Sequence, residues 1–263
     1  MSELLPEALS PGRRLFSRFY FKDYFLFKVV FTMKKRVLVL SICALPLLAN
    51  ASVVLENTRI IYDGGKEGKT VKITNNDATP YIVQLWTDSG NTHSRPGESN
   101  APFIILPPSF KMTPNSVQTT RIIYNGSPLP GDRESIFYFN MVQVPPVQQN
   151  QNAMAVVLKN RVKIFYRPAG IAAPGARALE AGLSFRAAAR GVSVTNQSPY
   201  FVSVVSALMN CTGNKTKLSV DMVKPLSNDA HWSATTAGRP GCTIDYTYVN
   251  DFGGKITARA KIE

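Results

Sequence analysis

The side chains that most often perform catalysis are scarce in this sequence. Its two histidines, His93 and His231, lie in polar surroundings that favour solvated loops. Beyond residue 51 there is no G-x-S-x-G, H-E-x-x-H, P-loop or G-x-G-x-x-G motif, and no pair of carboxylates is spaced for acid–base work. We therefore expect no enzymatic activity, no small-molecule substrate and no cofactor.

Three cysteines remain as reactive groups, and one of them, Cys43, lies in an apolar segment near the start of the chain. Two cysteines with only two histidines in the whole chain give no zinc-ligand spacing, so no metal site is expected. In an exported protein we expect Cys211 and Cys242 to form a disulfide. The alternative is a pair of buried free thiols.

Export is predicted by residues 33–51, which have the three parts of a secretory signal peptide. Met33 begins a basic stretch, residues 37–48 are apolar, and an Ala-x-Ala sequence ends at Ala51. We expect translation to begin at Met33 and cleavage to follow Ala51, so that residues 1–51 are absent from the mature protein. The alternative for residues 1–32 is a membrane-binding extension.

The charge of the chain is basic but does not identify a partner by itself. The chain has 30 Lys and Arg and 17 Asp and Glu. Eight of these basic residues and three of the acidic ones lie in residues 1–51, so the rest of the chain has a net charge of +8. A basic surface could meet nucleic acid, an anionic membrane or an acidic protein. No arginine-rich run or nucleic-acid motif follows residue 51, so we expect no nucleic-acid partner.

Short runs of β-branched and aromatic residues, separated by turn residues, predict an all-β protein. In residues 52–168 we expect seven strands, which favour an immunoglobulin-like β-sandwich with Trp86 where such folds often bury a tryptophan. The expected strands are 52–62, 71–74, 81–86, 103–106, 118–124, 136–144 and 153–166.

Residues 169–175 predict a linker, and residues 176–263 predict a second, smaller β-sandwich domain. Residues 178–189 have the composition of a helix, but Leu183 and Phe185 also fit a strand, so both readings stay open. Two sandwiches on one linker would leave a cleft between them. The further strands expected are 191–195, 200–209, 218–220, 243–249 and 255–262.

The segment 129–146 is the most specific part of the sequence. It contains Asp-Arg-Glu-Ser, then Phe-Tyr-Phe-Asn, then Pro-Pro. Four further matches stand in order: Thr-Arg at 58–59, Lys-Ile-Phe-Tyr-Arg-Pro at 163–168, Asn-Gln-Ser-Pro-Tyr at 196–200 and Asn-Asp-Phe-Gly-Gly at 250–254. Together they resemble the periplasmic pilus-assembly chaperones of the chaperone–usher pathway, the PapD-like family, over residues 52–263.

The resemblance implies two immunoglobulin-like domains in a boomerang arrangement. It also implies a periplasmic protein that binds, folds and caps pilus subunits by donor-strand complementation and delivers them to an outer-membrane usher. In that case Met154, Val156 and Leu158 are the donor-strand residues, with Ala155 and Val157 on the home-core face. The alternative is that the first three belong to the domain's own core.

The resemblance also assigns two sets of charged residues. Arg59 and Lys163 would grip the carboxylate at the C-terminus of the subunit, and Glu134, Arg167 and Asp251 would form an ionic link between the two domains. Lys163 has the opposite parity from Leu158, so strict alternation puts the two on opposite faces. We expect a bulge or strong twist between them if the strand serves both roles.

An alternative function is a secreted structural protein of the same fold, such as a pilus subunit or adhesin. A subunit would lack a strand and carry an N-terminal donor extension, whereas this chain has seven expected strands in its first domain. A chaperone with an uncovered apolar strand could also cap itself by forming a dimer.

Overall fold

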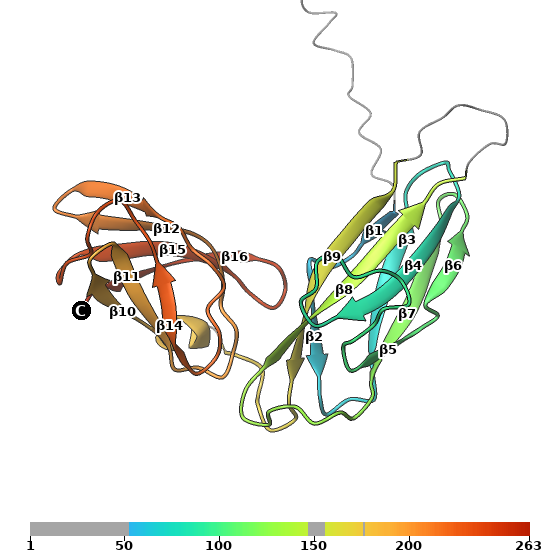
Figure 1. Ribbon diagram of the computed structural model, residues 1–263, viewed down its shortest axis with the longest axis horizontal. Helices are drawn as coiled ribbons and strands as arrows, with labels where there is room; N and C mark the ends of the chain where they lie inside the picture. Colours follow the sequence, from blue (N-terminus) through green and yellow to red (C-terminus); the bar gives the residue numbers. More distant parts are fainter. Residues whose placement is uncertain (1–52, 147–155, 176) are drawn as a thin grey trace, which may run out of the picture. The chain divides into compact units, whose positions relative to one another are not determined.

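A computed structural model of the chain describes residues 53–146, 156–175 and 177–263. The expected signal peptide with its cleavage site, and the donor-strand residue Met154, lie outside these residues. In the described part the chain forms two β-sandwiches, as predicted (Figure 1). No helix among the described residues has the length and apolar character needed to cross a membrane.

The N-terminal sandwich packs a four-stranded sheet, in the order β1-β3-β7-β5, against a five-stranded sheet, in the order β2-β9-β8-β4-β6. Its strands are β1 (Val53–Leu55), β2 (Arg59–Asp63), β3 (Lys69–Asn75), β4 (Tyr81–Asp88), β5 (Phe103–Leu106), β6 (Ser109–Met112), β7 (Val117–Tyr124), β8 (Ser135–Val144) and β9 (Leu158–Arg167).

The first expected strand is in fact two strands in different sheets. Val53–Leu55 pairs with β3, whereas Arg59–Asp63 crosses to the other sheet and pairs in parallel with β9. Residues 56–58 make the crossing. The strand β6 was also not predicted, because it is short and follows two prolines directly. These two differences determine which strands have free edges.

Trp86 is buried, but outside the core between the two sheets. It is 3% exposed and pairs with Asn140 on β8, while the neighbouring Leu85 enters the core. Its indole nitrogen donates to the hydroxyl of Ser94, which belongs to the loop after β4. Trp86 therefore lies on the outer face of the five-stranded sheet, beneath that loop, and not where the immunoglobulin pattern predicts it.

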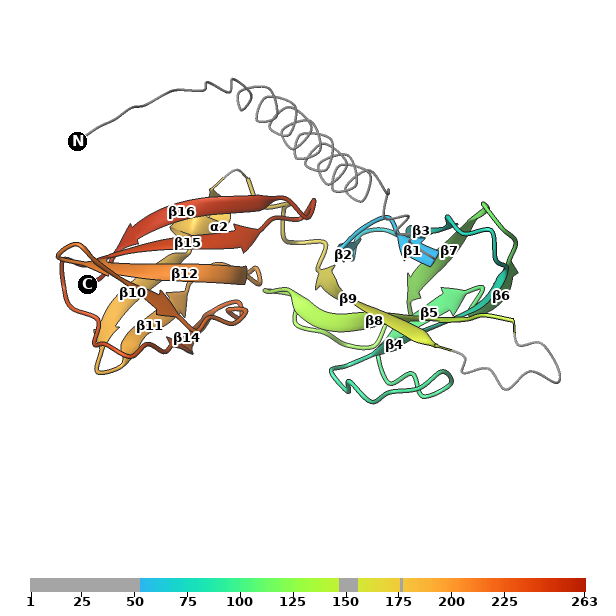
Figure 2. The same cartoon turned by 90° about the horizontal axis from the view of Figure 1, so that it is seen from above.

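The C-terminal sandwich packs a three-stranded sheet, β10-β11-β14, against a four-stranded sheet, β13-β12-β15-β16, and Figure 2 shows the two layers. Residues 178–189 are mainly strand, since the helix α2 spans only Ala178–Ala181. The core centres on Phe185, Trp232 and Tyr246, whose ring centroids lie 5.3–6.2 Å apart. The strands are β10 (Leu183–Ala188), β11 (Gly191–Asn196), β12 (Ser203–Cys211), β13 (Asn214–Leu218), β14 (Ser227–Trp232), β15 (Thr243–Val249) and β16 (Lys255–Lys261).

The expected disulfide is confirmed, so the free-thiol alternative is wrong. Cys211, the last residue of β12, is bonded to Cys242, which directly precedes β15. The bond closes a loop with a sequence separation of 31 and joins the two central strands of the four-stranded sheet.

Replacing both cysteines by serine is expected to lower the free energy of unfolding of the C-terminal sandwich by about 3–4 kcal/mol, because the unfolded chain regains the freedom of the open loop. Urea denaturation followed by tryptophan fluorescence measures the loss. A reductant should shift the wild-type transition equally and leave the variant unchanged. A serine variant as stable as the oxidised wild type would contradict the prediction.

Candidate functional site

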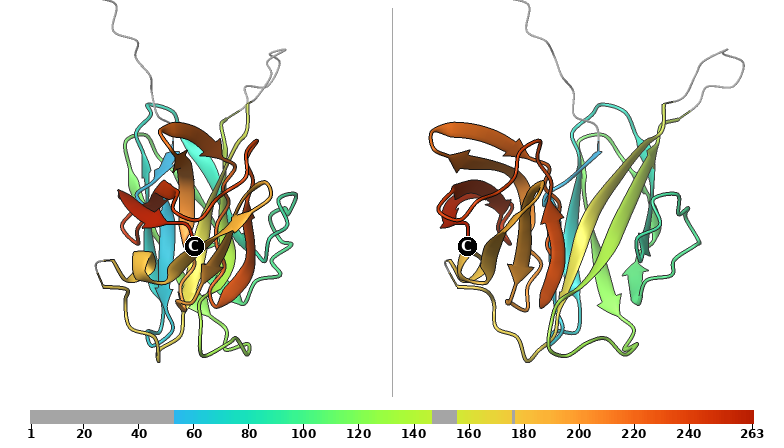
Figure 3. Two further views of the ribbon diagram at one scale, coloured as in Figure 1. Left: turned by 90° about the vertical axis from the view of Figure 1, so that its left-hand side faces the viewer. Right: turned by 60° about the vertical axis from the view of Figure 1, so that its left-hand side comes forward.

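The strand β9 is paired along only half of one edge. It pairs with β8 without interruption from Leu158 to Tyr166, and the two strands run side by side in Figure 3. On its other edge, β2 pairs only with Lys163–Arg167. Among the strands that the structure describes, none covers the second edge of Leu158–Val162. A strand edge of this kind is a template for another strand.

The exposed apolar residues of the site precede and begin this open segment. Leu158 is 49% exposed and Val156 is 67% exposed. Ile164 and Tyr166, which share the parity of Leu158, enter the core, so the inward-facing series of β9 continues past the end of the home core. Leu158 and Val156 therefore do not belong to the domain's own core.

The opposite parity also fails to reach the home core at this point. Val157, expected on the home-core face, is 51% exposed, and Ala155 lies outside the described residues. Neither Val156 nor Val157 therefore packs against the core of the sandwich. The expectation that Val157 packs at home is wrong.

Arg59 and Lys163 lie next to each other, at the residue pair where the open edge ends. They are register partners in the parallel pairing of β2 with β9. Side chains at paired positions of neighbouring strands share a face. The two residues are 104 positions apart in the sequence, and only the family resemblance linked them. The structure places them opposite each other at the first residue pair of β2 with β9.

Among the described residues, no carboxylate lies in direct contact with either of the two cations. Neither forms an ion pair within the part of the chain that the structure describes. Arg59 donates from Nη1 to the carbonyl oxygen of Val249 at 2.9 Å, while its buried Nε has no hydrogen-bond partner among the described residues. Lys163 Nζ lies 3.6 Å from the sulfur of Met222.

This environment disfavours both positive charges. Burial lowers the pKa of Arg59, with Asp251 partly opposing the shift. Burial and then the charge of Arg59 lower the pKa of Lys163, with the charge of Asp221 partly opposing the shift. Two half-buried cations with a free buried donor form a site that an anionic group would stabilise.

No bulge separates the two groups of site residues. The register of β9 with β8 runs unbroken from Leu158 to Tyr166, so strict alternation holds. Leu158 faces inward and Lys163 faces outward. The expected bulge is therefore absent, and the two groups of side chains lie on opposite faces of β9.

The three residues of the expected ionic link do meet. Arg167 binds Glu134 through Nε and Nη2 at 2.9 and 2.7 Å, and binds Asp251 through Nη1 at 2.9 Å. Glu134 also accepts the backbone N–H of Phe201 at 2.9 Å. Burial opposes the charge on Arg167, but its two carboxylate partners outweigh burial and raise its pKa. Unlike Arg59, Arg167 is fully neutralised.

Sequence reasoning missed the cations that support the open half of β9. Lys159 donates to the carbonyl oxygens of Thr92 and Ser94 at 3.1 and 2.9 Å, and its Nζ lies 4.9 Å from the centroid of the Trp86 ring. These contacts fasten the start of β9 to the loop after β4. The alternation of Lys159, Arg161 and Lys163 with less polar residues signals a polar outer face, but the sequence does not show its partners.

Arg161 completes this support through a buried carboxylate. It donates to Asp88 from Nη2 at 2.6 Å, and its guanidinium stacks 3.5 Å from the Tyr138 ring centroid. Asp88 is fully buried and also accepts from Asn140 and Ser94. Burial disfavours the ionised form, but the hydrogen bonds from Arg161 and Asn140 outweigh it, so the pKa of Asp88 is lowered.

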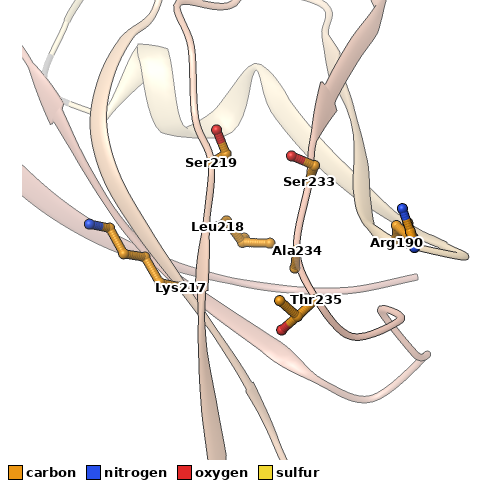
Figure 4. A pocket seen from close by; sticks show the side chains of 7 residues that line it. All are labelled: Arg190, Lys217, Leu218, Ser219, Ser233, Ala234 and Thr235. Atoms are coloured by element: carbon orange, nitrogen blue, oxygen red, sulfur yellow. The ribbon is translucent and has the colours of Figure 1, made fainter.

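A pocket in the C-terminal sandwich lacks a catalytic constellation. It has a volume of about 610 Å³ and lies in the C-terminal sandwich, where Leu218 and Ala234 point toward each other and Lys217 points away (Figure 4). The other lining residues are Arg190, Ser219, Ser233 and Thr235. None of the lining side chains could act as a general base at neutral pH. Among the described residues, no three His, Cys, Asp or Glu are grouped to hold a metal ion.

Comparison with known families places both sandwiches. Residues 52–172 match the model of the pili and flagellar-assembly chaperone, PapD N-terminal domain. Residues 178–260 match the model of the pili assembly chaperone PapD, C-terminal domain. The chain belongs to the PapD-like family of pilus-assembly chaperones. This is a family of chaperones and not of enzymes.

Individual relatives agree with the family models. The chain is 37% identical to the chaperone protein HifB of Haemophilus influenzae over 212 residues, which cover 78% of this chain and 86% of HifB. It is 34% identical to the chaperone protein FimB/FhaD of Bordetella pertussis over 222 residues, or 81% and 89% of the two chains. These relatives favour a fimbrial chaperone over the alternative of a pilus subunit or adhesin.

Solved structures give the same result. The crystal structure of the YadV chaperone matches with a TM-score of 0.68 at 28% identity, covering 80% of this chain and all of the other. The SafB chaperone of Salmonella enterica, solved in complex with the SafA pilin, matches with a TM-score of 0.63 at 25% identity, covering 80% and 96%. The chain is thus a fimbrial chaperone with the two-domain PapD-like fold.

The support beneath β9 yields a prediction for Asp88. Asp88→Asn should destabilise the N-terminal sandwich by about 2–3 kcal/mol at neutral pH, because Arg161 loses its charged partner while the shape is kept. The pKa of Asp88 is lowered by folding, so its contribution is present above the ordinary value of 3.8 and is lost as pH falls through the lowered pKa.

Denaturation of wild type and variant at several pH values measures this difference, which should shrink toward zero in acid. Asp132→Asn is the matched control, because Asp132 is exposed and forms a surface ion pair with its neighbour Arg133. An Asp88→Asn penalty that persists unchanged below the lowered pKa would contradict the assignment.

Proposed function

We propose that this chaperone captures pilus subunits by adding the open segment of β9 to a sheet of the subunit. The relative SafB, solved with a pilin, supports a subunit of this class as the partner. The backbone groups along Leu158–Val162 would form the ladder, and Val156 and Leu158 would fill the apolar gap of the subunit. Met154, outside the described residues, would continue this series with the same period.

Arg59 and Lys163 are proposed to bind the terminal carboxylate of the subunit. The observation that carries this proposal is their register pairing at the end of the open edge, where neither forms an ion pair with a described residue. A carboxylate there would accept charge-assisted hydrogen bonds, including one from the free Nε of Arg59. It would also set the register, because the added strand would have to end at this pair.

The link of Glu134, Arg167 and Asp251 is proposed to hold the first sandwich in a fixed relation to the second. Arg167 is 6% exposed and Glu134 is 4% exposed, so solvent screens their interaction little. Breaking such a link removes a buried charge partner, which costs far more than breaking a surface pair. Its role would be orientation of the domains during capture.

The cellular setting is also a proposal. Residues 33–51 would direct export to the periplasm, with cleavage after Ala51, and the relative SfaE is described as a periplasmic chaperone. There the complex would pass its subunit to an outer-membrane usher. Without a subunit, the same open edge could pair with a second copy of the chain in a self-capping dimer.

Lys163→Ala and Arg59→Ala should each leave the chaperone folded but abolish its co-purification with a co-expressed subunit, since one cation cannot replace the pair. Lys111→Ala is the control, because Lys111 is an exposed cation on β6. Near-ultraviolet circular dichroism verifies folding. If either variant retains full binding, the carboxylate assignment fails.

Val156→Glu and Leu158→Glu should also prevent capture, because a carboxylate cannot enter the apolar gap of the subunit. Val157→Glu is a closely matched control, since Val157 has similar exposure but the opposite parity. Co-purification of each variant with the subunit measures the effect. Equal losses at positions 156, 157 and 158 would argue against strand addition with alternate side chains.

A further inference from the structure

One face of the C-terminal sandwich carries a regular frame of cations. The pairings of β12, β13, β15 and β16 align two rows of outward side chains across the four-stranded sheet. The first row has Lys215 at one edge and Lys261 at the other, and the second has Lys217 and Arg259. Edge positions across four strands lie about 14 Å apart.

The charge of this outer face is almost entirely positive. Lys255, further along β16, is a fifth cation, and Asp245 between the edges is the one acid on the four strands. Asp245 is already paired with Arg259, whose Nη2 donates to it at 3.0 Å. The four lysines have no ion-pair partner among the described residues.

The other sheet of the same sandwich shows that this is not a general property of the domain. Outward positions of β10 and β14 carry Arg186, Asp229 and His231. Lysines on edge strands can also guard against unwanted strand pairing. Either a positive or a negative side chain can serve that role, so edge protection alone does not explain why both edges of this sheet carry only positive charges.

The composition of the face fits an anionic lipid surface better than a protein. Protein interfaces are depleted in lysine and anchored by aromatic residues. Here the outward positions hold mainly lysine, threonine and serine, and β12 exposes two aliphatic side chains, Val205 at 49% and Leu208 at 41%, but no aromatic one. Long, mobile lysines over a flat face suit dispersed lipid phosphates, which need no shape complementarity.

We propose that the face formed by Lys215, Lys217, Lys255, Arg259 and Lys261 docks the chaperone on membranes that contain anionic phospholipid. The contact is electrostatic and reversible, and each basic side chain near such a surface strengthens binding about fivefold. It uses none of the residues assigned to subunit capture. A chaperone held at a membrane would search for an acceptor in two dimensions.

The test is co-sedimentation of the purified protein with vesicles of phosphatidylglycerol and phosphatidylcholine, compared with phosphatidylcholine alone. The variant carries Lys215→Glu, Lys217→Glu and Lys261→Glu. The control carries Lys66→Glu, Lys111→Glu and Lys224→Glu, which change the net charge equally at exposed positions elsewhere. Circular dichroism verifies the fold, and a triple Lys→Gln version of the face provides a milder second variant.

Wild type is expected to bind only the anionic vesicles, and more weakly as salt rises from ~0.05 M to ~0.15 M. The face variant should bind more than tenfold more weakly, the glutamine version should lie between, and the control should stay within about threefold. Equal losses in face and control variants would show that net charge alone acts and would overturn the proposal. Undiminished vesicle binding by the face variant would also overturn it and would direct the search to an acidic protein partner.

Discussion

The binding site that we propose depends on the incomplete pairing of one edge of β9. Because the chain crosses between sheets after β1, β2 reaches β9 only at Lys163 and leaves the preceding segment half-paired. Such an edge would invite aggregation unless its exposure serves a purpose. The outer face of the same segment is held down by Lys159 and Arg161, so the strand can stay extended while one edge is open.

The charged residues near this strand fall into two classes that physical chemistry separates. Arg161 and Arg167 each meet carboxylates with short, multiple hydrogen bonds, and their energetic role is complete within the chain. Arg59 and Lys163 are half-buried without such partners, which is unfavourable in the free protein. On this basis Arg161 and Arg167 stabilise the fold itself, whereas Arg59 and Lys163 are the cations that we propose for binding the subunit.

Local patterns were enough to predict the two sandwiches and most strands, because alternation and turn residues reflect short-range geometry. The disulfide was predicted from the expected export of the protein and its cysteine count. The pairing of Arg59 with Lys163 required a family resemblance, since no local rule connects residues on distant strands. The crossing from β1 to β2 was missed because residues 56–58 carry no strong turn signal. The structural role of Asp88 was not predicted, because its hydrogen-bond partners come from β8, β9 and a loop, which are distant in the sequence and meet only in the folded chain.

The position of Trp86 on the outer face of the five-stranded sheet has a practical consequence. Each sandwich contains one of the two tryptophans in the chain. The ring of Trp86 lies beneath the ammonium group of Lys159, near the start of β9. Indole emission responds to nearby charge and to solvent access. A variant in which Trp232 is replaced by phenylalanine would leave Trp86 as the single tryptophan. Its emission spectrum would then report whether the start of β9 stays packed on the indole ring, without any attached dye.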